Sequence, residues 1–408
     1  MMSDTEKLLS FGITGSVSPN TPLKRNPSFL LSHLEVQKLL IQVAGEPRSR
    51  SFIESALEDT MITLEDLVKT GLLKQAGEHF RISFILFLQQ DLAAIKAVAG
   101  ELSENLAKQY LDRADEFQQV LQKTTSEHNS ANALAFILIG CFSLDWDGLQ
   151  ITSELDYRTE PRPTERGDRY IAWAEERQYE DVRGIYWGSH NDYYADCVLT
   201  TFGDHCALPR TAFPDLGWRL ERSIYKLDVE PSLEQNLMRA FSPYVSDFSE
   251  QLGLLMLALG RGIRELEPLS NELSITPEHT LSLLDLLIEL HYVEGDTTSG
   301  FKPIIPTLPA ADAAMVDEVL TLSGEILVDW LQEHIDELRD RLGNLTPLKY
   351  GLTFQEIFSQ IWHYLFGMAN QHMVEAGFFA DPYNTERQYQ GFIPAVWHPD
   401  VMPEESTF

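Results

Sequence analysis

The residues best suited to chemistry lie close together in the middle of the chain. They are His190, Asp192, Asp196, Cys197, His205 and Cys206. Imidazole and thiolate groups are common zinc ligands, but the spacing H-x6-C-x7-H-C matches no common zinc framework. We therefore predict no metal site and expect the cysteines to be small apolar core residues. The candidates for lining a ligand pocket are His190, Asp192, Asp196 and His205, with His363 from a later helix.

Other patterns typical of catalysis are weak or missing. Asp145 and Asp147 would share one face of a strand as a carboxylate pair, although a turn with solvated aspartates is the commoner arrangement. The sequence has no nucleophile in a strained elbow, no Walker-type phosphate loop, and no HExxH or EF-hand spacing. We therefore predict a protein without a cofactor that is not an enzyme. An enzyme with its site in residues 185–210 remains a third hypothesis.

The charge balance limits the choice of partners. The 408 residues include 31 Lys and Arg against 62 Asp and Glu, which gives a net charge of −31. Such a charge repels phosphate backbones at long range, so DNA binding needs a locally less acidic surface. Three cysteines without CxxC spacing indicate a reducing compartment. With no secretory signal and no apolar run long enough to span a bilayer, we predict a cytoplasmic protein that does not contact a membrane.

Composition and periodicity divide the chain into five segments. Residues 1–30 are rich in Ser, Pro, Thr and Asn and predict a flexible tail, in which Lys24 and Arg25 are interpreted as solvated. The other segments are two modules, each with a following long helix (31–129 and 232–345), a mixed α/β sensor or interaction domain (130–231), and an aromatic helix with a tail (346–408). The predicted fold class is α+β and mainly helical.

Local patterns place several elements. Ser32 and Glu35 have capping-box spacing at the start of a helix, and Thr276-Pro277 is typical of another helix start. Residues 170–181 (YIAWAEERQYED) predict a helix, whereas 184–218 predict strands and loops.

The two modules share their pattern at a nearly constant offset. At 220 residues, Leu64, Leu67, Val68, Leu72 and Leu73 align with Leu284, Leu287, Ile288, Tyr292 and Val293. At 221 residues, Phe80, Asp91 and Ile95 align with Phe301, Asp312 and Val316. The agreement covers a helix, a hairpin, a strand and an Asp-initiated helix, so we predict an internal duplication.

A family resemblance follows from these motifs. Residues 269–295 (LSNELSITPEHTLSLLDLLIELHYVEG) are similar to the helix–turn–helix of many bacterial repressors, and residues 64–73 have the related pattern LxxLxxxGLL. Each module resembles the winged helix–turn–helix of regulators of the MarR, ArsR and GntR type, and the two copies cover about a third of the chain. The resemblance implies the fold more specifically than DNA binding, because winged helices also serve as protein–protein modules.

The charges depart from the pattern of DNA-binding family members, which carry Arg or Lys on the exposed face of the third helix and in the wing. In the second module we expect that face to present Glu278, His279, Ser282, Asp285 and Glu289. Residues 246–315 hold three basic and eleven acidic residues, a net charge of −8, which makes this module a poor DNA reader. Residues 31–100 hold seven and nine, a net charge of −2. The candidate phosphate contacts are therefore Arg48, Arg50, Lys69, Lys74 and Arg81.

The C-terminal helix is the most aromatic element. Thr353 and Glu356 form a capping box at its start, and Gly377 fits its end. Because the helix is apolar on all sides, we expect it to be buried in the monomer or in a dimer interface. His363 on this helix fits a hydrogen-bonded core histidine better than a pocket residue.

Two hypotheses for the function lead. The first is a transcriptional regulator that binds double-stranded DNA through the first module, forms a homodimer through its long helices, and senses a small-molecule effector or a protein partner in the middle segment. The alternative is an acidic winged-helix adaptor that binds proteins and no nucleic acid.

Overall fold

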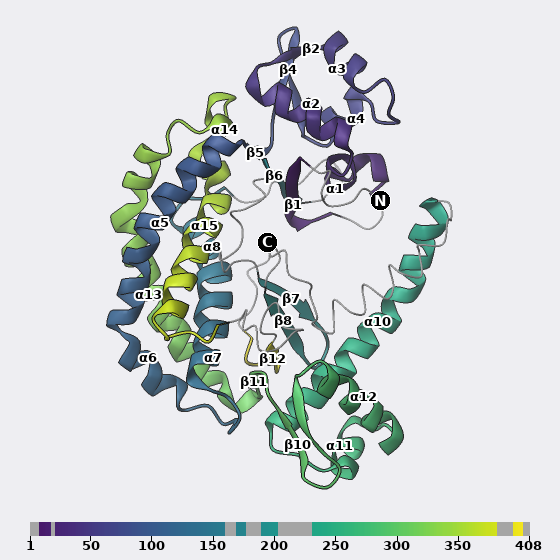
Figure 1. Cartoon of the computed structure of the whole chain (residues 1–408), viewed down its shortest axis with the longest axis vertical. Helices are drawn as coiled ribbons and strands as arrows, with labels where there is room; N and C mark the ends of the chain where they lie inside the picture. Colours follow the sequence, from purple (N-terminus) through teal and green to yellow (C-terminus); the bar gives the residue numbers. More distant parts are fainter. Residues whose placement is uncertain are drawn as a thin grey trace.

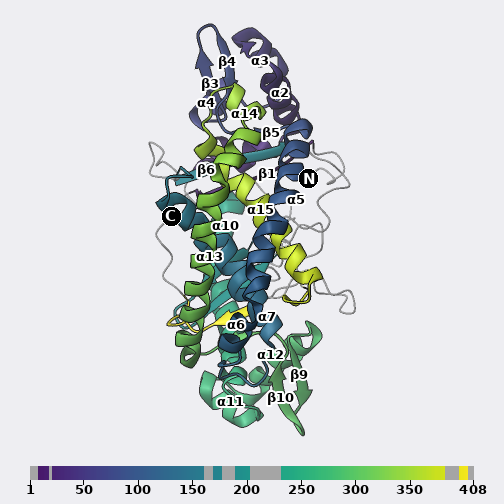
Figure 2. The ribbon, with the colours of Figure 1, turned by 90° about the vertical axis from the view of Figure 1, so that its left-hand side faces the viewer.

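The computed structural model describes residues 8–17, 21–159, 169–176, 189–202, 231–381 and 395–402. Its described residues form a mainly helical α+β protein. A body of long helices carries one small helical module at each end, so that the molecule is elongated (Figures 1 and 2). The predicted fold class is confirmed.

The first module has the order of elements expected of a winged helix. Its elements are α2 (Leu34–Gly45), β2 (Arg48–Ser49), α3 (Arg50–Ala56), α4 (Leu64–Lys69), β3 (Leu73–Ala76) and β4 (His79–Ile82). The strands form an antiparallel sheet in the order β2-β4-β3, with a wing that turns at Gly77. The third helix, α4, begins at a capping box of Thr63 and Asp66. The predicted box at Ser32 does not form, because α2 begins after His33, which makes no side-chain cap.

The second module repeats this arrangement without the first short strand. Its elements are α10 (Pro231–Gly260), α11 (Leu266–Leu273), α12 (Pro277–Glu289), β9 (Val293–Asp296) and β10 (Gly300–Pro303). The predicted start of its third helix is confirmed, since Thr276 accepts a hydrogen bond from the His279 amide and Pro277 is the first residue of α12.

Two further sheets join the modules to the body. One has the order β1-β6-β5 and consists of β1 (Leu9–Ser16), β6 (Arg169–Glu176) and β5 (Ile85–Phe87). The other has the order β11-β12-β8-β7 and consists of β11 (Thr307–Leu308), β12 (Ala395–Trp397), β8 (Val198–Phe202) and β7 (Ser189–Tyr193). The strand that follows each module, β5 or β11, therefore ties that module to the helical body.

The body consists of helices from both halves of the chain. They are α5 (Gln89–Asp112), α6 (Ala114–Leu121), α7 (Ala131–Ala135), the π-helix η3 (Phe136–Asp147), α8 (Gly148–Glu154), α13 (Ala313–Arg341), α14 (Thr346–Lys349) and α15 (Phe354–Glu375). Short elements complete the chain: η2 (Leu23–Arg25), α1 (Pro27–Leu31) and η4 (Ala310–Asp312). Figure 2 shows α5 and α13 extending together between the two modules.

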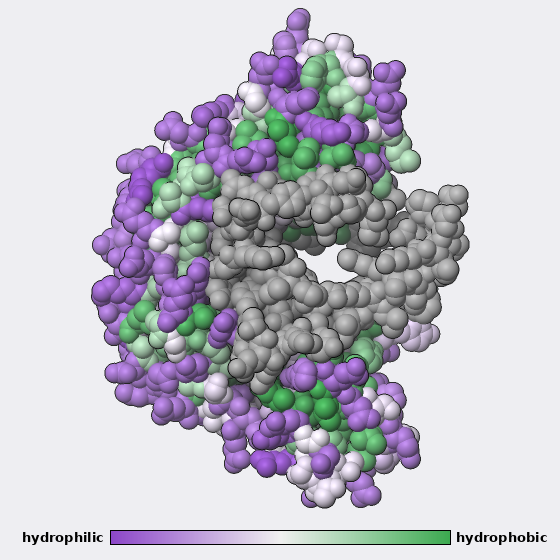
Figure 3. Space-filling model, in the orientation of Figure 1, coloured by the Kyte–Doolittle hydropathy of each residue, from purple (hydrophilic) through white to green (hydrophobic). Residues whose placement is uncertain are grey.

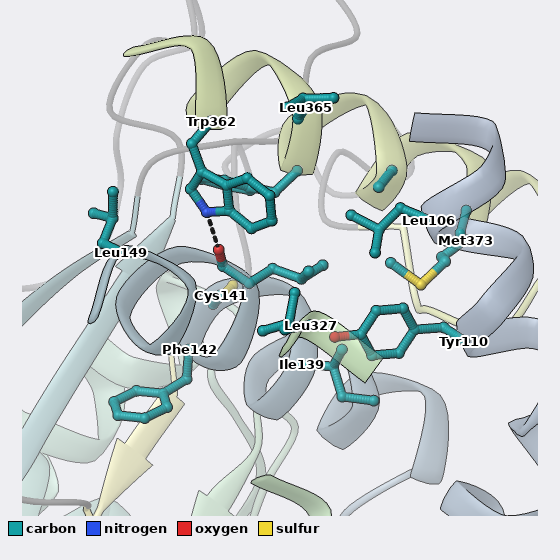
Figure 4. Close-up of a cluster of buried hydrophobic side chains, with 14 of the residues drawn as sticks. Leu106, Tyr110, Ile139, Cys141, Phe142, Leu149, Leu327, Trp362, Leu365 and Met373 are labelled. Carbon is teal, nitrogen blue, oxygen red and sulfur yellow. Dashed lines mark hydrogen bonds between the residues drawn. The ribbon is translucent and has the colours of Figure 1, made fainter. Parts of the chain in front are cut away.

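The largest hydrophobic cluster lies between these helices. Trp330 of α13 and Trp362 of α15 are fully buried there. The indole of Trp362 donates a 2.7 Å hydrogen bond to the Leu144 carbonyl of η3 (Figure 4). The capping box of Thr353 and Glu356 and the left-handed backbone of Gly377 (φ 73°) confirm the predicted bounds of the aromatic helix. It is buried within the monomer.

The first 30 residues do not form a flexible tail where the structure describes them. Residues 9–16 form β1, which pairs along its whole length with β6, and Leu30 and Leu31 are fully buried. The prediction was wrong because the polar composition hides three apolar anchor points, Leu9 among them, whose burial in the first module fixes the segment.

The segment 130–231 does not form a core of its own among its described residues. Residues 131–154 are a continuous helix inside the main cluster, while β6 belongs to one sheet and β7 and β8 to the other. The predicted helix at 170–181 is also wrong, because residues 169–176 form the central strand β6 between β1 and β5. Pairing on both sides outweighs the helical propensity of Ala and Glu there.

The helix Ala131–Glu154 is long and apolar enough to cross a membrane by length and composition. Its most apolar 18-residue window is, however, 78% buried inside the molecule. Its apolar character is therefore explained by packing against α13 and α15.

A buried carboxyl links β6 to α15. Glu175 accepts a 2.8 Å hydrogen bond from the Tyr364 hydroxyl, while its Oε1 atom has no hydrogen-bond partner among the described residues. Burial raises the pKa of Glu175 to about 7. The folded protein therefore binds this proton more tightly than the unfolded chain, and this contribution to stability is lost as the pH rises from about 4.5 to above 7.

We predict that Glu175→Gln flattens the dependence of stability on pH. The free energy of unfolding of the wild type should fall by on the order of 2–3 kcal/mol between pH 5 and pH 8 through this group. The variant should not show this fall, because an amide does not ionise. Chemical denaturation at both pH values measures it. The exposed Glu333→Gln variant is the control, and an equal loss in Glu175→Gln and wild type would contradict the assignment.

Candidate functional site

The exposed side of the first module's third helix is the surface on which the DNA hypothesis depends. α4 has only six residues, and its first turn carries Glu65 and Asp66. Met61, just before the helix, is 65% exposed, and Val68 is 37% exposed. This surface therefore combines apolar side chains with carboxylates.

Arg50, a predicted phosphate contact, is bound by two carboxylates. Its Nη1 atom lies 2.8 Å from Glu65 of α4 and 3.0 Å from Glu54 of α3. The hydrogen bonds that Arg50 donates to Glu65 and, to a lesser degree, to Glu54 raise the pKa of Arg50, and the bond to Arg50 lowers the pKa of Glu65. The three charges sum to −1, so this corner of the module attracts cations rather than phosphates.

Two other predicted phosphate contacts, Arg48 and Arg81, already interact with neighbouring groups of the protein. Arg48 is 2.6 Å from Glu46, and its guanidinium lies 4.7 Å from the centre of the Phe52 ring. Arg81 packs beside Gly351, in the loop between α14 and α15, and its Nε atom is buried. It therefore faces the helical body rather than the open side of the wing.

Lys69 and Lys74 are the two remaining candidates. Lys69 is exposed at the end of α4, and Lys74 is half-buried on β3, opposite Arg81. Neither has an ion-pair partner among the described residues. The structure thus leaves two of the five predicted contacts available to a phosphate.

Two basic residues of the N-terminal segment also contact α4 or the loop just before it. Lys24 donates to the Met61 carbonyl at 2.5 Å, and Arg25 lies 3.3 Å from Asp66. Lys24 is exposed, as the interpretation of a solvated side chain expects, whereas Arg25 is half-buried against Asp66. The adjacent apolar residues Leu30 and Leu31, which are buried in the core of the first module, anchor this segment.

The third helix of the second module is acidic on its exposed side, as predicted. Glu278, His279, Ser282, Asp285 and Glu289 are all exposed. The three carboxylates have no ion-pair partner in the described part of the chain. Figure 3 shows hydrophilic residues over much of the visible surface of both modules.

The predicted pocket residues are not brought together where they are described. Asp192 is half-exposed on β7, and Asp196 is exposed in the turn to β8, where its amide donates to Glu250 of α10. The side chain of His190 and the whole of His205 and Cys206 lie outside the described residues. The described residues contain no group of three His, Cys, Asp or Glu side chains that could hold a metal ion.

His363 lies in the helical body instead. Its Nδ1 atom is 2.6 Å from the Ser359 carbonyl, and its Nε2 atom is 3.7 Å from Asp145 of η3. Asp145 in turn accepts hydrogen bonds from the amide (2.9 Å) and hydroxyl (2.8 Å) of Ser189. The carboxylate lies between the serine and the histidine, so the imidazole is not placed to accept the hydroxyl proton, and the group ties α15, η3 and β7 together.

Asp145 and Asp147 occupy neither a strand nor a turn. Both lie in the π-helix, where Asp145 is buried and burial raises the pKa of Asp147 to about 7. Sequence reasoning missed Ser189, which binds Asp145 from a distant strand. No local pattern marks such a partner 44 residues away.

An open groove of about 630 Å³ lies between α5 and α13. It is lined by Gln109, Asp112, Arg113, Gly324, Glu325, Ile326, Val328 and Asp329. None of the predicted pocket residues is among them.

Scans against protein-family models, curated proteins and solved structures find no match to this chain.

We predict that Cys141 and Cys197 are unreactive in the native protein. Both are buried; burial raises the pKa of Cys197 to about 12 and that of Cys141 well above its ordinary value. In a Cys206→Ser variant, a thiol reagent such as Ellman's should titrate two thiols in guanidinium and label the native protein at least about 100-fold more slowly. Rapid native labelling of Cys197 would show that its thiol is accessible and would reopen the metal hypothesis.

Proposed function

We propose that this protein is an acidic winged-helix adaptor that binds other proteins and does not bind DNA. The observation that supports this function is the charge and the ion pairing at the third helix of each module. In the first module, Glu65 of the third helix binds Arg50 of α3, which Glu54 also binds, and in the second module the third helix presents three carboxylates that have no cationic partner among the described residues. A DNA backbone brings negative charge to the same surfaces, so both would repel it.

The transcriptional regulator remains the second candidate because of Lys69 and Lys74. Two phosphate contacts would give a salt slope of only about −1.8, far from the steep dependence of proteins that make many such contacts. The adaptor also accounts for Met61 and Val68, since exposed apolar side chains beside polar ones are typical of protein interfaces.

We predict that wild-type protein does not bind duplex DNA saturably, even at low salt. A Glu54→Gln, Glu65→Gln variant frees Arg50 and should show weak binding that disappears as salt is added. Fluorescence anisotropy against a pool of labelled duplexes measures both. Glu333→Gln, Asp340→Asn has the same change in charge on α13, away from α4, and should not bind. Saturable wild-type binding that Lys69→Ala, Lys74→Ala removes would instead support the regulator.

The adaptor function predicts protein contact at α4. A photo-crosslinking amino acid at Met61, introduced into the full chain in the cells that make it, should give discrete protein adducts. The same amino acid at Glu333 is the matched control and should not give these adducts. Val68→Asp, combined with the Met61 crosslinker, should reduce the adducts several-fold because it places a third carboxylate in the apolar contact. Adducts of equal yield at both positions, unaffected by Val68→Asp, would argue against an interface at α4.

A further inference from the structure

The second half of the chain repeats the first well beyond the two modules. Each half contains a strand before its module, a strand after it, a long helix, a last helix and a last strand. In the first half these are β1, β5, α5 with α6, the helix α7–η3–α8, and β6. In the second half they are β8, β11, α13, α15 and β12. In both sheets the last strand lies between the other two, parallel to the strand after the module and antiparallel to the strand before it.

The two halves exchange equivalent hydrogen bonds at the starts of their long helices. The Thr346 amide donates to Asp91 Oδ1 at 2.8 Å, and the Thr125 amide donates to Asp312 Oδ1 at 2.7 Å. Adding 221 to 91 gives 312, and adding 221 to 125 gives 346. The second contact is therefore the first with the two halves interchanged.

A second pair of contacts obeys the same offset. The Tyr350 hydroxyl bonds to the amide (3.2 Å) and the carbonyl (3.1 Å) of Leu86 in β5. The Asn129 side chain bonds to the amide (3.1 Å) and the carbonyl (2.7 Å) of Thr307 in β11. The offset of 221 converts 86 to 307 and 129 to 350. Different side chains at equivalent positions thus bind the same backbone groups of the opposite half.

The packing of the helices is reciprocal as well. α5 of the first half packs against α15, the last helix of the second half. α13 of the second half packs against η3 and α8, the last helix of the first half. Interchange of the halves converts one contact into the other, which is the relation that a two-fold axis imposes on a symmetric dimer.

We infer that this chain is a duplicated subunit whose halves form a two-fold pseudo-dimer, and that this internal interface replaces the homodimer expected from the sequence. The surfaces on which a second copy would dock are already occupied by the other half, down to the backbone groups of β5 and β11. The protein is therefore a monomer, and a single chain supplies both modules.

Light scattering after size exclusion tests the oligomeric state of the wild-type chain. The expected mass is 46.4 kDa, unchanged over a hundredfold range of concentration. A particle of twice that mass would overturn the proposal, because it would show that the internal interface does not replace a dimer.

Hydrogen exchange tests the reciprocity. In the wild type, the peptides that contain Thr125 and Thr346 should be protected to a similar degree. Asp91→Ala should increase exchange at Thr346 about tenfold, and Asp312→Ala should do the same at Thr125. The matched control is Asp336→Ala, whose carboxylate pairs with Arg339 within one helix. If either Ala variant fails to fold, Asp91→Asn, Asp312→Asn and the protection of the two peptides in the wild type still test the reciprocity. Increases confined to the half that carries the substitution would overturn the proposal.

Discussion

The structure depends on the packing of each long helix against the last helix of the opposite half. Trp330 of α13 and Trp362 of α15 are fully buried in the cluster that these two helices form with α5 and η3, and burial of such rings contributes about 4–6 kcal/mol each before the loss of conformational entropy. Because both long helices belong to this core, the module attached to each is fixed relative to the other. The spacing of the two modules is thus set by the helical body and not by a linker.

The π-helix shows how this core tolerates an unusual element. Its wide turns offer carbonyl groups to neighbouring side chains: Trp362 donates to Leu144, Asn370 donates to Gly140, and the Ser189 hydroxyl, which donates to Asp145, lies 2.7 Å from the Cys141 carbonyl. Two of these donors lie on α15 and one on β7. Gly148, just after the π-helix, leaves room for the Trp362 ring, which lies 2.7 Å from the position of an added Cβ. The element is therefore stabilised by its surroundings, since π-helices are rarely stable alone.

The sequence predicted the features that short-range chemistry determines. Thr276-Pro277 and Thr353 with Glu356 begin helices because their caps use residues within one turn, and the offset of 221 identified equivalent positions such as Asp91 and Asp312. It did not predict β1 or β6, whose partners are about 160 residues apart along the chain and leave no local pattern. It also overestimated the DNA-binding surface, because the pairing of Arg50 with Glu65 appears only when α3 and α4 pack together.

Comparison of equivalent positions in the two halves separates those that maintain the fold from those that are exposed for binding. Positions that join the halves retain their roles, as Asp91 and Asp312 do, because both must satisfy a backbone amide of the other half. The exposed faces of the third helices have no such constraint, and they differ: Met61 and Val68 lie at α4 beside Glu65, which pairs with Arg50, whereas α12 carries three carboxylates that have no cationic partner in the described part of the chain. Resemblance to DNA-binding regulators lies in the buried positions, while binding depends on the exposed ones. The resemblance of the sequence to such regulators therefore carries little weight here against the charge of the two surfaces that would have to meet the DNA.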